Sequence, residues 1–305
     1  MIALTIEKGF REVSTWDEVF EMPGYTNSLD PKEEELKQIL GKYEFLTYEK
    51  CGLSNCGTPH GKGYIVETAS GKLTNIGSYC GKKHFSVEFE NLSRDFDRYY
   101  RDHKARERIE TFQKSINSKF SEVASIENDF GNIDTAYKIQ QFFKGKSRNY
   151  PKTIVQKLSK MVKDNDPNIY IDKMLSKEEI DAREASGQKN VSKYERVVAD
   201  SITGLNFLYE YNDLRLLYVI EFKNSLEEIQ KLNVDNLLSK DLDFWSKKIG
   251  ELDSNIRRIR EVMEEGYNFL QLGNMIKITS ENSDDFRYLL FILNADYSMQ
   301  ITQYN

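Results

Sequence analysis

The chain has 305 residues, of which 39% are hydrophobic, 30% are charged and 12% are aromatic. Wholesale disorder is excluded, because this apolar and aromatic content is enough to build a core. The net charge of −6 excludes a globally basic nucleic-acid wrapper, and no run approaches the 18 apolar residues of a membrane-spanning helix.

The first 50 residues predict a cytoplasmic protein that begins with two short helices. The opening MIALTIEKGFREV has no apolar segment of the kind found in signal peptides. Residues 15–22 form a candidate helix that Ser14 or Thr15 can cap and that Pro23-Gly24 ends. Residues 31–40, PKEEELKQIL, form a second candidate, with Pro31 at its first position and acidic residues in its first turn.

Cysteine and histidine are concentrated in residues 51–84. Cys51 and Cys56 are each followed by Gly, as in a zinc knuckle, and residues 63–77 predict a β-hairpin that turns at Ser70-Gly71. Cys80 and His84 share one face if a helix begins near Ser78. A knuckle, a hairpin and two ligands on a first helical turn predict a treble-clef-like zinc finger.

The finger offers five candidate ligands, and Zn²⁺ takes four N or S ligands in structural sites. We expect Cys51, Cys56, Cys80 and His84 to bind structural Zn²⁺, with His60 as the rival fourth ligand. The alternatives are buried free thiols beside surface histidines, or one nucleophilic cysteine with a histidine base. A catalytic zinc is disfavoured, because the nearby acids form no metalloenzyme pattern.

The region after the finger predicts long helices and one basic window. Residues 85–130 lack Pro and Gly, and their aromatic and aliphatic residues recur at helical spacing. Residues 135–163 contain eight Lys or Arg and no acid, with Tyr and Phe interleaved. Such a window suits an acidic protein surface, nucleic acid or simple solvation. Its candidate partner-binding residues are Lys138, Lys144, Lys146, Arg148 and Lys152.

The C-terminal part predicts a helical bundle with an apolar seam. Residues 166–190 are charged and poor in apolar residues, which indicates a linker. From 238 to 263, apolar residues recur in alternating steps of four and three, as in a coiled coil. The seam can pack inside the chain or against a second copy, and we expect a homo-oligomer. Its proposed residues are Leu242, Trp245, Ile249, Leu252, Ile256, Ile259 and Met263.

These patterns together predict a mainly α fold of four parts. Residues 1–90 form a zinc-finger head with short flanking helices, and residues 91–165 form a long helical arm with the basic patch. Residues 166–190 are the linker, and residues 191–305 form the C-terminal helical bundle and oligomerisation region. No GxSxG, HExxH or dinucleotide-binding pattern is present, so we expect a protein that is not an enzyme.

The segments CGLSNCGTPHGKGY and TNIGSYCGKKHF resemble a pattern in phage and prophage proteins of about this length, in which a Cys/His finger precedes a long helical region. In size and helical make-up the chain also resembles phage anti-defence proteins that block the bacterial Gabija system. This resemblance implies an oligomeric, non-enzymatic inhibitor that binds a host nuclease complex in the host cytoplasm and blocks its access to DNA. From the lack of a long apolar run we expect no membrane contact. The alternative function is a zinc-finger regulator that binds nucleic acid.

Overall fold

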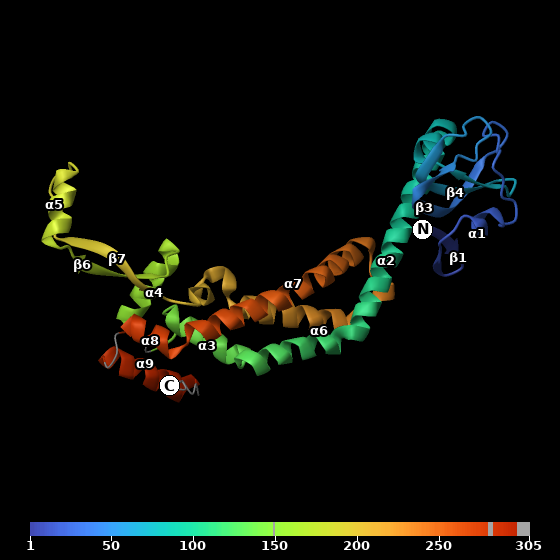
Figure 1. The fold of residues 1–305 in the computed structure, drawn as a ribbon. Coiled ribbons are helices and arrows are strands. Elements are labelled where there is room, and N and C mark those ends of the chain that lie inside the picture. The colour runs from blue at the N-terminus through green and yellow to red at the C-terminus, as the bar shows by residue number, and fades with distance from the viewer. Residues whose placement is uncertain (149, 280–282, 298–305) are drawn as a thin grey trace. The chain divides into compact units, whose positions relative to one another are not determined.

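The computed structural model describes residues 1–148, 150–279 and 283–297, and the chain divides into two compact units (Figure 1). Unit 1 comprises residues 1–111 and 233–247, and unit 2 comprises residues 112–232 and the chain from 248 onwards. Of the described residues, 58% lie in helices and 20% in strands. The predicted mainly α fold with a treble-clef-like finger is therefore wrong, because the N-terminal region is built on a five-stranded antiparallel sheet.

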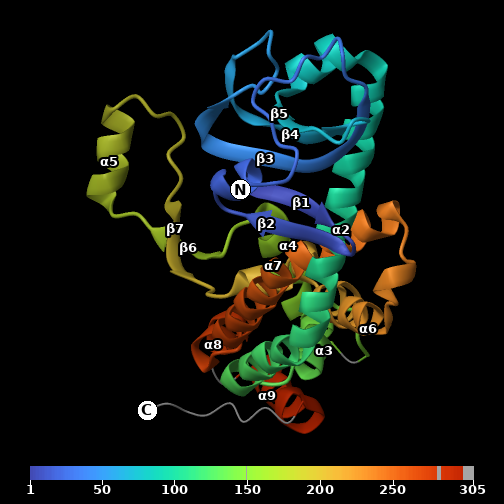
Figure 2. The same cartoon turned by 90° about the vertical axis from the view of Figure 1, so that its right-hand side faces the viewer.

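The sheet of unit 1 has the strand order β2-β1-β3-β4-β5 (Figure 2). The predicted hairpin is confirmed as β4 and β5, which pair from Glu67↔Leu73 to Tyr64↔Ile76. The five strands are β1 (Ile2–Ile6), β2 (Gly9–Val13), β3 (Leu36–Lys50), β4 (Pro59–Thr68) and β5 (Leu73–Ile76).

Both faces of the sheet are covered, and the four consecutive residues Tyr64 to Glu67 of β4 include three that are buried. Tyr64 and Val66 belong to one apolar cluster with Phe89 of α2 (Ser78–Phe130). Ile65 belongs to a second cluster with Val19 of α1 (Asp17–Phe20). Side chains alternate between the faces of a strand, so a run of apolar residues in β4 serves two cores at once.

The predicted helix over 31–40 is wrong, because Leu36 begins the long strand β3. The register of β3 against β4 shifts between Leu36 and Gln38 and again between Ile39 and Gly41. These irregularities interrupt the alternation of a regular strand and leave Leu36 and Ile39 at a helical spacing. Pairing with β1 and β4 overrides the local helix propensity of this segment. A short helix is present where 15–22 predicted one, but α1 covers only Asp17–Phe20, and Trp16 rather than Ser14 or Thr15 is its N-cap residue.

The long helix predicted over 85–130 is confirmed, and as expected it begins at Ser78. Its backbone is not helical at Ser86, where φ is 49° and ψ is −130°. L-residues rarely adopt this conformation, and it separates the first two turns of α2 from the rest.

Unit 2 has a two-stranded sheet of β6 (Asn168–Met174) and β7 (Tyr194–Ser201), and the chain after α2 contains further helices. The predicted linker at 166–190 therefore carries β6 and a helix, and the helical bundle predicted over 191–305 begins instead with the strand β7. The α-helices are α3 (Ile133–Phe143), α4 (Lys152–Asp164), α5 (Lys177–Ala185), α6 (Asn224–Lys231), α7 (Ser239–Phe269), α8 (Leu272–Thr279) and α9 (Asp284–Tyr297). The short helices are η1 (Leu205–Leu208), η2 (Glu210–Asn212), the π-helix η3 (Arg215–Lys223) and η4 (Val234–Asn236). Of these helices, η4 and the start of α7 belong to unit 1.

The predicted apolar seam lies on α7, and the chain itself covers most of it. In unit 2, α7 contacts α2 through the ion pairs Arg260–Asp129 (2.9 Å) and Lys119–Asp253 (2.8 Å). The seam is therefore ordinary core, and we do not retain it as an oligomerisation surface. Leu242, Ile249, Leu252, Ile256, Ile259 and Met263 are buried, and Trp245 is half-buried.

No helix in the described part of the chain is both long enough and apolar enough to cross a membrane.

We predict that Gly63→Ala destabilises unit 1 by about 2 kcal/mol. An added Cβ would collide with the carbonyl oxygen of Ile76 and the hydroxyl of Tyr43. Both tryptophans, Trp16 and Trp245, lie in unit 1, so their fluorescence during urea unfolding reports on this unit.

The matched control is Gly273→Ala in α8, where an added Cβ meets no atom within 4 Å. Ala favours helix over Gly, so unfolding followed by circular dichroism should show no loss of stability. An unchanged urea midpoint for Gly63→Ala contradicts the packing described for β4.

Candidate metal centre

Three cysteines from two segments of the chain meet in unit 1. The Sγ atoms of Cys51, Cys56 and Cys80 all lie within 4.8 Å of one another, and those of Cys56 and Cys80 are 3.3 Å apart. Thiolates that share one tetrahedral Zn²⁺ lie about 3.8 Å apart, from Zn–S bonds of about 2.3 Å. The cluster therefore has the dimensions of a metal site, and its donor set consists of soft sulfur ligands.

A tight loop after β3 carries the first two cysteines. The backbone N–H of Cys51 donates to the carbonyl oxygen of Thr58 (3.0 Å), and that of Cys56 donates to Leu53 (3.1 Å). Gly57 has φ of +72°, a left-handed conformation that glycine adopts without strain. The glycine that follows Cys56 thus has the role expected of a knuckle, because it lets the chain turn back into β4.

The neighbouring strand β5 fixes this loop in place. Asn75 is buried and donates its side-chain N–H to the carbonyl oxygen of Lys50 (2.8 Å). Thr74 is also buried, and its hydroxyl lies within hydrogen-bond distance of the carbonyl oxygens of Thr26 (2.6 Å) and Gly52 (3.2 Å). An added Cβ at Gly52 would collide with the Thr74 hydroxyl, so the close approach requires glycine. Local sequence patterns do not reveal these roles of Thr74 and Asn75, because the partner residues Gly52 and Lys50 lie more than 20 residues away.

The third cysteine comes from the first turn of α2, as the sequence predicted. Cys80 is buried in the same apolar cluster as Phe85 and Phe89. The break at Ser86 confines the segment that carries Cys80 and His84 to residues 78–85. The orientation of this short segment is therefore independent of the rest of α2. It can be set by the contacts of Cys80 with the other cysteines and with the sheet.

Neither histidine belongs to the group of close donor atoms, but both line a cleft of about 450 Å³ beside Cys56 and Cys80. His60 is half-buried, and its Nδ1 forms a 2.7 Å hydrogen bond with the hydroxyl of Tyr43. Its Nε2 is buried and has no hydrogen-bond partner among the described residues. A buried polar atom without a partner is costly and rare, so this nitrogen is a candidate for a ligand bond. His84 is half-buried on the first helical segment.

The three thiols differ in acidity. Burial raises the pKa of Cys51, and it raises the pKa of Cys80 to about 12. A hydrogen bond with the Thr58 side chain lowers the pKa of Cys56 to about 7. Burial also lowers the pKa of His60, which favours the neutral imidazole. Neutral imidazole and thiolate are the forms that bind metals.

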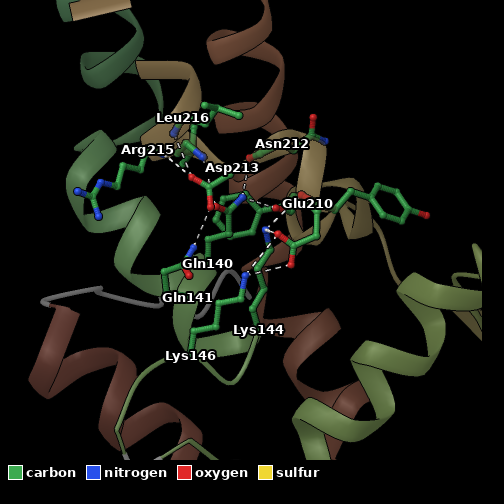
Figure 3. Close-up of polar contacts among 12 residues, drawn as sticks. Gln140, Gln141, Lys144, Lys146, Glu210, Asn212, Asp213, Arg215 and Leu216 are labelled. Carbon is green, nitrogen blue, oxygen red and sulfur yellow. Dashed lines mark hydrogen bonds and ion pairs between the residues drawn. The ribbon is translucent and has the colours of Figure 1, made fainter. Parts of the chain in front are cut away.

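The basic window of 135–163 is partly used within unit 2 (Figure 3). The side chain of Lys144 is only 6% exposed, and it donates to the carbonyl oxygen of Tyr209 (3.2 Å). Lys146 forms an ion pair with Glu210 (3.1 Å). Two of the five predicted partner-binding residues therefore hold the loop of residues 205–215, while Lys138, Arg148 and Lys152 are exposed.

Gln140 anchors the same loop from α3 (Figure 3). Its side chain is fully buried and donates to the carbonyl oxygens of Phe207 (2.6 Å) and Asn212 (2.8 Å). It also accepts a bond from the backbone N–H of Leu214 (3.3 Å). Its neighbour Gln141 is half-buried and makes one longer contact with Asp213 (3.3 Å). This network fixes the backbone of residues 207–214 against α3.

No protein-family model, curated protein or solved structure matches this chain.

We predict that Gln140→Ala destabilises unit 2 by about 3 kcal/mol, because it leaves three buried backbone groups without partners. Gln141→Ala is the matched control and should cost less than about 1 kcal/mol. Urea unfolding followed by circular dichroism measures both, and equal effects would contradict the anchoring role.

Proposed function

We propose that this chain is a non-enzymatic binding protein whose N-terminal unit is stabilised by structural Zn²⁺. The observation that carries the proposal is the cluster of Cys51, Cys56 and Cys80 within 4.8 Å. These cysteines come from the β3–β4 loop and from the start of α2. A metal bound to all three would cross-link the loop to the first turn of α2. Structural Zn²⁺ contributes directly to folding in such sites.

We assign the fourth ligand to His60, in place of the His84 favoured by sequence spacing. The support is the buried Nε2 of His60, which has no hydrogen-bond partner in the described chain. The Tyr43 hydroxyl holds the other ring nitrogen at 2.7 Å. Histidine ligands usually make such a bond through the nitrogen that does not bind the metal. His84 lines the same cleft and is the alternative.

We predict that the purified protein contains about one Zn²⁺ per chain, because one cluster supplies the ligands. Cys51→Ser and Cys80→Ser should lose the metal and lower the unfolding midpoint reported by tryptophan fluorescence. His60→Ala should weaken zinc retention against a chelator more than His84→Ala does. Metal analysis by mass spectrometry and chelator competition provide the measurements.

Absence of zinc from protein purified without chelators contradicts the metal proposal. Retention by His60→Ala with loss from His84→Ala would instead assign His84 as the ligand. Gly273→Ala in unit 2 serves as the control for nonspecific metal loss.

We further propose that the binding target is a host nuclease complex of a bacterial immune system such as Gabija. The support is the resemblance of the chain in size and helical make-up to phage proteins that block this system, beside the resemblance of the finger segments to phage and prophage proteins. In this function the chain occludes the DNA-binding surface of the complex and performs no chemistry. The zinc site then keeps the sheet of unit 1 rigid enough to form a protein interface.

We predict that the protein co-purifies with the assembled Gabija complex and inhibits its DNA cleavage stoichiometrically, because an occluding inhibitor does not turn over. Size-exclusion chromatography and a nuclease assay with excess DNA measure these effects. Binding to naked DNA that weakens steeply with salt would favour the nucleic-acid regulator instead. Lack of any complex, with full nuclease activity at equimolar inhibitor, contradicts the inhibitor function.

A further inference from the structure

Residues 168–201, here called the arm, form the least buried part of unit 2. The arm consists of β6, α5 and β7, and Figure 1 places α5 at the far end of the hairpin from α4. Leu175 is its only fully buried residue within the described chain, and α5 has none. Two-stranded sheets and nine-residue helices are marginally stable in water on their own. We therefore expect another protein surface to cover the arm and stabilise it.

One face of the hairpin is defined by the register of its strands. Tyr170 lies opposite Val198, Asp172 opposite Arg196, and Met174 opposite Tyr194. Side chains alternate between the two faces, so these six residues lie on the same face, here called the pairing face. Met174, Tyr194 and Val198 are 66%, 56% and 55% exposed. The pairing face thus has a charged centre between two apolar pairs.

The helix α5 is tied to the opposite face. Lys173 forms an ion pair with Glu179 (3.5 Å), and Glu195 forms one with Arg183 (2.8 Å). Lys173 and Glu195 lie opposite each other in the register and alternate with the residues of the pairing face. These contacts of α5 therefore leave the pairing face uncovered.

The charged centre of the pairing face has no ion pair of its own. The guanidinium of Arg196 lies 4.1 Å from the ring centroid of Tyr170, and both side chains lie on this face. Neither Arg196 nor Asp172 forms a salt bridge with another described residue, and both are exposed. An acid and a base are thus available side by side to a further molecule.

We propose that the pairing face binds the same face of a second copy of this chain, around a two-fold axis parallel to the strands. The axis lies midway between the two facing hairpins and above the line that separates β6 from β7. Rotation about it places each β6 opposite the β7 of the other copy. The register then sets Asp172 against the second copy's Arg196, and Met174 against its Tyr194. Tyr170 meets Val198 in the same way, so every contact is acid on base or apolar on apolar.

The choice of a second copy follows from this self-complementarity. A uniformly acidic or basic partner would meet one matching and one opposing charge at the centre of the face. A two-fold interface repeats each contact, so a single Asp–Arg match occurs twice. Six side chains per copy form a small interface, and we expect association in the range of tens of micromolar.

The test uses charge reversal on the full-length chain, with sedimentation velocity up to about 0.2 mM. Asp172→Arg and Arg196→Asp should each weaken self-association by about tenfold or more, because each places like charges together twice. An equimolar mixture of the two variants should restore association to within about threefold of the wild type. In that mixture each arginine of one chain faces an aspartate of the other.

The mixture separates contact between copies from damage to the hairpin, because each variant keeps its own like-charge pair within the chain. The matched control is Asp181→Arg, which makes the same charge change on α5 between Glu179 and Arg183, at a position turned away from both. It should leave association unchanged. A monomeric wild-type chain at the highest concentration, an oligomer unaffected by both reversals, or a mixture without restored association overturns the proposal.

Discussion

The pairing of β3, β4 and β5 is the constraint on which unit 1 depends. Residues 51 and 80 are far apart in sequence, and no local rule brings their side chains together. The antiparallel register sets the end of β3 beside the start of β4 and places Asn75 of β5 against the backbone at Lys50. The loop with Cys51 and Cys56 is then held against the segment that begins α2. The thiol cluster is therefore a consequence of sheet register.

The same register connects the candidate metal centre to both cores of the unit. Tyr43 is buried in the cluster on the α1 side of the sheet, and its hydroxyl contacts His60. Cys51 and Cys80 belong to the cluster on the α2 side. A ligand that joins these side chains stabilises packing on both faces, because movement of either core would displace a donor atom. The proposed role of zinc follows from this position, since β4 contributes to both clusters.

In unit 2, buried polar side chains hold a loop in place through hydrogen bonds to its backbone. Gln140 and Lys144 replace solvent around the backbone of residues 207–214, and Lys144 has its pKa lowered by burial. Lys144 and Lys146, which the sequence presents as candidate partner-binding residues, thus make contacts within the chain. The arm shows the opposite situation, because Asp172 and Arg196 are neighbours in the sheet and neither has an ion-pair partner in the described structure. Repeated weak contacts between copies would add avidity on a large symmetric target.

The sequence by itself determined the features that local patterns encode: α1, the β4–β5 hairpin, the start of α2 at Ser78 and the grouping of three cysteines. Each depends on spacing, turn residues or periodicity within a few residues. Only the tertiary structure decided that residues 36–50 form a strand, because the shifts against β4 hide its alternation and pairing overrides helix propensity. It also decided that the seam on α7 is core, because burial depends on whether the chain itself supplies the covering helix. For the same reason residue spacing could not predict that the Nε2 of His60 is buried without a hydrogen-bond partner among the described residues, or that the pairing face of the arm is exposed. Both features depend on the residues that surround them in space.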